Sequence, residues 1–202
     1  MQRNGVVLVV CAASGTGKTT LVKRLLEEFP CFAYSISCTT RAPRVGEVEG
    51  KDYYFLSRED FCQRRDRGYF AEWAEVYGNL YGTPLSSTLE MLHQGKDLLF
   101  EIDVQGASQL RLTLAQSTCV FVLPPSLGEL EKRLHARATD DEATICRRLA
   151  NATLEIREAH WFDTWIVNDD LEQAYDQLRA TYIAATLKPS LQPLLLRTLI
   201  TR

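Results

Sequence analysis

A short polar run near the N-terminus, Ser14-Gly15-Thr16-Gly17-Lys18-Thr19, combines residue types that bind a polyphosphate. Its two glycines let the backbone turn several N–H groups toward one point, which is the geometry that surrounds phosphate oxygens. Lys18 adds a movable positive charge, and the Thr19 hydroxyl is a ligand that Mg²⁺ accepts. With Ala12 and Ala13 leading into it, the run predicts a site for a nucleoside triphosphate and its Mg²⁺.

Two flanking elements must hold this run in place. Residues 6–11, VVLVVC, are apolar without alternation, which is typical of a parallel strand covered on both faces. Apolar residues at helical spacing follow the run, and Pro30 ends that helix, whose positive N-terminus points at the same anion. Ala12 stands where the usual pattern has a glycine. We expect it to be tolerated if it keeps strand dihedrals, because only a positive φ excludes a Cβ there.

A second set of side chains matches a phosphate monoester. Arg41 and Arg44 flank Pro43 and offer planar guanidinium forks, and Tyr53 and Tyr81 offer phenolic donors. These residues predict an anion subsite separate from the glycine-rich run.

Carboxylates and hydroxyls in the same part of the chain suit a guanine base. Guanine presents adjacent N1–H and N2–H₂ donors beside an O6 acceptor, so ionised Glu72 and Asp103 would accept while Ser37 and Thr83 add hydroxyls. Asp103 ends an expected strand over residues 97–103, and ligands of open parallel sheets collect beyond the carboxyl ends of strands. The sequence thus contains partners for both ends of GMP.

Composition narrows the class of protein. The chain has 202 residues, a net charge of −3 and no Lys/Arg tract, so it carries no footprint for nucleic-acid binding. Six cysteines without a CxxC pair predict reduced thiols and a cytoplasmic location. No apolar stretch approaches the roughly 20 residues of a membrane span, and no pattern predicts an oligomeric state.

The remaining pattern predicts a β-rich insertion followed by alternating strands and helices. Residues 32–37 and 52–56 are expected as strands, a helix capped by Ser57 runs toward Gly68, and two strands meet across Gly78-Asn79. Further along, we expect helices capped by Ser86 or Ser87, by Ser126, and by Asp169 or Asp170, a helix from about 142 to 159, and strands at 118–123 and 164–167.

Several long stretches closely resemble the guanylate kinase family over roughly residues 4–187. They are SISCTTRAPRVGEVEGKDYYF, EWAEVYGNLYGT, LLFEIDVQGA, VFVLPPS and WIVNDDLEQAY. The resemblance implies that Arg41, Arg44, Tyr53 and Tyr81 hold the GMP phosphate.

The resemblance also assigns the remaining roles. It implies that the base is read by Ser37, Glu72, Thr83 and Asp103. It implies that Arg137 and Arg148 swing from a lid onto the ATP phosphates, with Lys18 also catalytic, and that Asn168 lies beside the adenine. The choice of Arg148 over Arg147 rests only on the following Leu149.

The fold implied by the resemblance is α/β, of the P-loop NTPase type: a parallel five-stranded sheet flanked by helices, with a β-rich GMP-binding insertion and a helical lid. The expected single domain divides into a core at 1–36, 85–125 and 160–188, a GMP-binding lobe at 37–84, a lid at about 126–159, and a tail at 189–202. The leucines of that tail could pack on the core or on another subunit, and a packing or frayed segment without catalytic content is expected.

The expected reaction transfers the γ-phosphoryl group of ATP to GMP, and dGMP is expected to serve as an acceptor as well. Two alternatives stay open. One is a non-catalytic phosphopeptide-binding module with a guanylate-kinase-like fold, which the intact Gly17-Lys18-Thr19 disfavours. The other is a P-loop kinase for another small acceptor such as ribose bisphosphate, which would not need the insertion with Glu72, Tyr81 and Thr83.

Overall fold

A parallel five-stranded sheet forms the centre of the protein, in a computed structural model that describes residues 3–76, 78–136 and 141–201. The strand order is β2-β7-β1-β8-β9, so β1 lies in the middle. The strands are β1 (Val7–Ala12), β2 (Phe32–Ala33), β7 (Asp97–Glu101), β8 (Thr118–Leu123) and β9 (Thr164–Val167). The expected fold class is confirmed.

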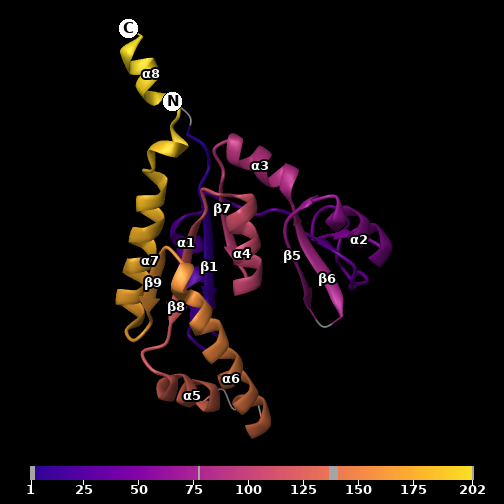
Figure 1. The fold of residues 1–202 in the computed structure, drawn as a ribbon, viewed down its shortest axis with the longest axis vertical. Helices are drawn as coiled ribbons and strands as arrows, with labels where there is room; N and C mark the ends of the chain where they lie inside the picture. The colour runs from indigo at the N-terminus through magenta and orange to yellow at the C-terminus, as the bar shows by residue number, and fades with distance from the viewer. Residues whose placement is uncertain (1–2, 77, 137–140, 202) are drawn as a thin grey trace.

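Helices cover both faces of this sheet, as the unalternating apolar sequence of β1 requires. On one face, Leu8 and Val10 pack with α1 (Lys18–Glu28) and α7 (Leu171–Thr186). On the other, Val9 packs with α4 (Val104–Thr113). Figure 1 shows α1 and α7 on one side of β1 and α4 on the other.

The insertion forms its own mixed sheet beside the core, in the order β4-β3-β6-β5 (Figure 1). Its elements are β3 (Cys38–Thr39), β4 (Tyr54–Phe55), α2 (Arg58–Asp66), β5 (Phe70–Val76) and β6 (Asn79–Pro84). Phe61 of α2 is fully buried against Phe70 and Leu80 of this sheet. The insertion, called the lobe below, therefore has a small core of its own.

The remaining elements complete the two ends of the sheet. Near the carboxyl ends of the strands lie α5 (Leu127–Ala136) and α6 (Glu142–Glu158). At the other end, α3 (Leu85–His93) connects β6 to β7, and η2 (Pro189–Leu191) and α8 (Leu195–Ile200) follow α7. The 3₁₀ turn η1 (Ala159–Trp161) connects α6 to the amino end of β9. Leu191 is buried in the core, whereas Leu196 and Leu199 of α8 are exposed.

Three expectations about elements are wrong in detail. The helix α3 begins after Pro84 and not after Ser86 or Ser87, because β6 runs directly into it and Thr88 donates to the Pro84 carbonyl at 2.7 Å. Only Phe32–Ala33 pairs with β7, because the chain then leaves the edge of the core sheet to enter the lobe. The strand expected at 97–103 ends at Glu101, since Asp103 caps α4.

Across the described ranges, no helix is both long enough and apolar enough to cross a membrane.

Candidate active site between the phosphate loop and the lobe

The glycine-rich run forms a loop between β1 and α1, called the phosphate loop below (residues 12–19). Gly15 and Gly17 have φ values of 95° and 89°, a region that side chains with a Cβ rarely adopt. Ala12 is the last residue of β1, which keeps it in extended backbone. The loop surrounds a cavity of about 390 Å³ that all eight of its residues line. Its geometry is that of an anion site at a helix N-terminus.

Asn168 fixes the loop from behind. Its Nδ2 donates to the Thr16 carbonyl at 2.7 Å, and a Cβ on Gly17 would lie only 2.5 Å from that nitrogen. Asn168 is 6% exposed, and its own carbonyl accepts from Arg133 at 2.9 Å. Gly17 is therefore required both for its φ and for this close approach. The predicted contact of Asn168 with adenine stays a prediction.

Glu101 contacts both the Lys18 ammonium and the Thr19 hydroxyl of the phosphate loop. Thr19 Oγ1 donates to Glu101 Oε1 at 3.0 Å, and Lys18 Nζ lies 3.8 Å from the same oxygen. Lys18 Nζ also lies 3.5 Å from the Ile102 carbonyl. The Lys18 ammonium and the Thr19 hydroxyl therefore sit at the carboxyl end of β7, as an anion and metal site at this edge requires.

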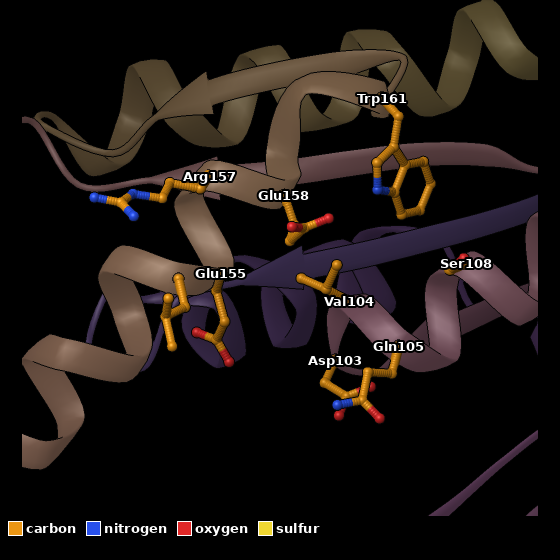
Figure 2. Close-up of a pocket in the computed structure, with 9 residues that line it drawn as sticks. Asp103, Val104, Gln105, Ser108, Glu155, Arg157, Glu158 and Trp161 are labelled. Atoms are coloured by element: carbon orange, nitrogen blue, oxygen red, sulfur yellow. The ribbon is translucent and has the colours of Figure 1, made fainter.

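Two further carboxylates, Asp103 and Glu155, line the same cavity. They also line a neighbouring cleft of about 680 Å³ between α4 and α6. Figure 2 shows Glu155 on α6 facing this cleft across from the start of α4, with Trp161 at its other end. Burial and the nearby Asp103 raise the pKa of the Glu155 carboxyl, while Lys18 and the Ser14 N–H favour its ionised form.

A smaller pocket of about 190 Å³ lies where the lobe meets the core. Ser37, Glu72 and Thr83 line it together with Glu101, which also borders the phosphate-loop cavity. Glu72 is 9% exposed, and the Thr83 hydroxyl donates to its Oε1 at 2.6 Å. Burial raises the pKa of the Glu72 carboxyl, Thr83 partly opposes this, and repulsion from Asp103 adds to it.

Arg41, Tyr53 and Tyr81 form a cluster at the surface of the lobe. The Arg41 guanidinium lies 5.4 Å from the centre of the Tyr53 ring, and the two tyrosine rings are 6.1 Å apart. Glu47 accepts from Arg41 Nη2 at 2.8 and 3.0 Å, and also from the Arg44 backbone N–H. Glu47 thus orients Arg41 and the turn that carries Arg44.

The structure does not bring the predicted lid arginines that it describes to the phosphate-loop cavity. Arg137 lies outside the described residues, as does Ala138 beside it. Arg147 and Arg148 lie on α6, and in the described part of the chain neither lines the phosphate-loop cavity. Their assignment stays a prediction.

The structure adds three residues that the sequence interpretation missed, namely Glu101, Glu155 and Arg133. A signal for Glu101 was present, because a strand period of two places it on the same side as Asp103 in LLFEID. Glu155 and Arg133 carried no such signal, since each looks like one more charge on an amphipathic helix.

Comparisons with known proteins agree with this geometry. A family model described as guanylate kinase matches residues 4–185. The chain is 63% identical over 198 residues to a guanylate kinase of Oleidesulfovibrio alaskensis, covering 98% of this chain and 96% of that protein. It is 65% identical over 188 residues to that of Nitratidesulfovibrio vulgaris, covering 93% and 91%.

A solved structure supports the same relationship. The guanylate kinase of Anaplasma phagocytophilum superimposes with a TM-score of 0.67 at 34% identity, covering 95% of this chain and 91% of that one. With a family model spanning most of the chain and relatives above 60% identity over nearly its whole length, this protein belongs to the guanylate kinase family.

Proposed function

We propose that this protein transfers the γ-phosphoryl group of ATP to GMP, giving ADP and GDP. The observation that carries the proposal is that two differently built cavities meet at Glu101. One is the phosphate loop with Lys18, and the other holds the buried Glu72–Thr83 pair. A donor triphosphate and an acceptor nucleotide bound in them would approach each other at the carboxyl end of the core sheet.

On the donor side, the loop N–H groups and the N-terminus of α1 would hold the ATP phosphates, with Lys18 following the transferring group. Arg137 and Arg148 are proposed to add charge from the lid, and Asn168 to lie near the adenine while it anchors Thr16. Each of these groups acts through position and charge and forms no covalent bond to the phosphoryl group.

On the acceptor side, the phosphate of GMP would bind at Arg41, Arg44, Tyr53 and Tyr81. The guanine would bind in the small pocket lined by Ser37, Glu72 and Thr83, and Asp103, which lines the neighbouring phosphate-loop cavity, would read its edge from outside that pocket. The acceptor phosphate is itself the nucleophile, so the chain needs no general base. It needs in-line placement and the exclusion of water, which would otherwise accept the phosphoryl group.

The residues at the loop fit a magnesium ion that arrives with ATP. Thr19 Oγ1 and Glu101 Oε1 are hard oxygen donors 3.0 Å apart. In the described residues, no group of three or more His, Cys, Asp or Glu side chains is placed so that it could hold a metal ion by itself. When bound, the ion neutralises phosphate charge. Thr19 would hold it, with Glu101 beside it.

A coupled assay of ADP release tests the proposal with GMP, dGMP, AMP, UMP and ribose bisphosphate as acceptors. We expect transfer to GMP and dGMP and little to the others, because AMP and UMP lack the paired N–H donors that face Glu72 and Asp103. Faster transfer to ribose bisphosphate would favour the other kinase class. No ADP release with any acceptor, together with tight phosphopeptide binding, would favour the binding module.

A further inference from the structure

The strand that carries Glu72 contains a bulge. In the pairing of β5 with β6, Phe70 lies opposite Pro84 and Glu72 lies opposite Thr83, which leaves Ala71 as an extra residue. Phe70 and Trp73 consequently pack into the same lobe core, although residues three apart in a regular strand point to opposite faces. Ala71 is instead buried in the main core beside Ala107 and Leu110 of α4.

The bulge lets Glu72 face the pocket while Phe70 and Trp73 both pack into the lobe core. Because Ala71 takes up one extra position, Glu72 pairs with Thr83 and points to the pocket side of the sheet. In a regular strand of the same sequence, Phe70 and Glu72 would share one face and Trp73 would lie on the other, so Phe70 and Trp73 could not both pack into the lobe core while Glu72 faces the pocket. The position of the proposed base-reading carboxylate therefore depends on whatever holds this irregular backbone.

Two side chains of α4, one helical turn apart, hold the bulged backbone of β5. Gln109 Nε2 donates to the Trp73 carbonyl at 2.9 Å, and the Trp73 N–H donates to Gln109 Oε1 at 3.0 Å. The Thr113 hydroxyl lies 2.8 Å from the Ala71 carbonyl and shares its single proton with the Gln109 carbonyl at 3.0 Å. The residues on both sides of Glu72 are thus bonded to α4.

The same helix begins at the second carboxylate. Asp103 caps α4, and its Oδ1 accepts from the Gly106 N–H at 2.8 Å. Asp103 is therefore fixed at the start of α4, and Glu72 is fixed to the same helix through Gln109. Their separation is set by α4 and not by the hairpin of the lobe alone. They are close enough for the charge of Asp103 to raise the pKa of Glu72.

We propose that Gln109 is a positioning residue for base recognition, with Thr113 in a supporting role. Gln109 bonds both the backbone N–H and the backbone carbonyl of Trp73 and so fixes the peptide after Glu72. Glu72 and Asp103 then present their oxygens to guanine at a set spacing. The inference rests on the proposed function only in taking guanine as the ligand of these two carboxylates.

The test compares Gln109→Leu with Gln116→Leu, the same change at an exposed glutamine beyond the end of α4. Calorimetry measures the affinities for GMP and for IMP, which lacks the 2-amino group. For Gln109→Leu we expect GMP affinity to fall about 10- to 100-fold, the size of effect that loss of one hydrogen bond between the base and a charged group produces. We expect IMP affinity to fall much less, so that the GMP-to-IMP ratio narrows. Gln116→Leu should match wild type.

A second pair of variants guards against a simple folding defect. Thr113→Val removes the hydroxyl at nearly constant volume, and Thr113→Ser restores it. We expect Thr113→Val to narrow the GMP-to-IMP ratio by a smaller factor and Thr113→Ser to recover it. An unchanged ratio in Gln109→Leu and Thr113→Val, with native circular dichroism, would overturn the inference, since a purely structural role lowers both affinities alike. Binding of GMP without any ADP release would instead overturn only the proposed function.

Discussion

Replacing Glu72 with Gln gives the sharpest test of how the base is read. The change keeps the length and shape of the side chain, and the amide oxygen can still accept from the Thr83 hydroxyl at its 2.6 Å distance. The substitution removes the negative charge and turns one acceptor oxygen into a donor. Because Glu72 is 9% exposed, water cannot readily compensate for the lost charge.

The size of the effect follows from the bonds at stake. A hydrogen bond to a charged group contributes about 1.5–3 kcal/mol, which corresponds to a factor of about 10–150. Wild type should therefore prefer GMP over IMP by about this factor, since IMP lacks the 2-amino donor. AMP should be used about 10⁴-fold less well, because it leaves buried acceptors unpaired. In Glu72→Gln we expect kcat/KM for GMP to fall by at least tenfold. The ratios of kcat/KM for GMP over IMP and for GMP over AMP should both become smaller.

The assay measures kcat/KM for GMP, IMP and AMP in wild type, Glu72→Gln and Asp103→Asn, with folding followed by circular dichroism. Glu75→Gln is the matched control, because Glu75 lies on the same strand but pairs with Arg58 at the surface. Burial raises the pKa of Glu72, so its substitution should also move the acid limb of the GMP profile to lower pH. Unchanged ratios among the three acceptors in both site variants would show that guanine is read elsewhere.

Three further outcomes test other parts of the structure. Lys18→Ala should abolish ADP release while GMP binding stays nearly intact, and turnover within a few-fold of wild type would remove Lys18 from the mechanism. Arg41→Lys and Arg44→Lys should each weaken GMP binding about 10- to 100-fold but leave guanosine binding unchanged, as calorimetry can check. Asp97 is 2% exposed and accepts hydrogen bonds from Arg3. Asp97→Asn should therefore lower the free energy of unfolding by about 3 kcal/mol at pH 7, as thermal melts can measure. Burial opposes the ionised form of Asp97, but the bonds from Arg3, the Val6 N–H and Tyr182 outweigh it and lower the pKa of Asp97. In melts, the stability that this lowered pKa contributes should be complete above about pH 3.9 and should be lost progressively below it, as the pH falls through the folded value.

Local signals in the sequence predicted most of the elements. Strands β8 and β9 begin and end at the predicted residues, and Ser57, Ser126 and Asp170 accept the backbone hydrogen bonds expected of helix caps. These features depend on residues within a few positions of one another. A sequence interpretation therefore has the information that it needs.

The misplaced start of α3 shows the limit of that information. Ser86 and Ser87 are good capping residues, yet the helix is capped by Pro84 because the Leu85 N–H donates to the carbonyl of Tyr69, the residue just before β5. That bond comes from a residue 16 positions away in the chain. Tertiary contact therefore overrode local preference, as it also did where β2 ended early to let the chain cross into the lobe.

The same distinction holds within the candidate site. Residues that are proposed to meet a ligand directly belong to recognisable runs, as Lys18 and Arg41 do. Residues that hold other residues, such as Asn168 behind Gly17 or Gln109 behind Glu72, reveal themselves only through distances. Their side chains are ordinary amides, and nothing in an amide's spacing along a helix or loop indicates which backbone group it will bond.

These supporting contacts divide the proposed GMP site between two parts of the fold. The Arg41–Tyr53 cluster belongs to the lobe, whereas Asp103 belongs to α4, and Glu72 is bonded to α4 through the bulge. A nucleotide that meets Arg41 with its phosphate and Asp103 with its base therefore connects the lobe to the core. Guanosine alone would meet only the base-reading residues, and inorganic phosphate alone would meet only the Arg41–Tyr53 cluster. Because a ligand stabilises an arrangement only by its differential contacts with it, the complete monophosphate should fix the lobe where neither fragment does.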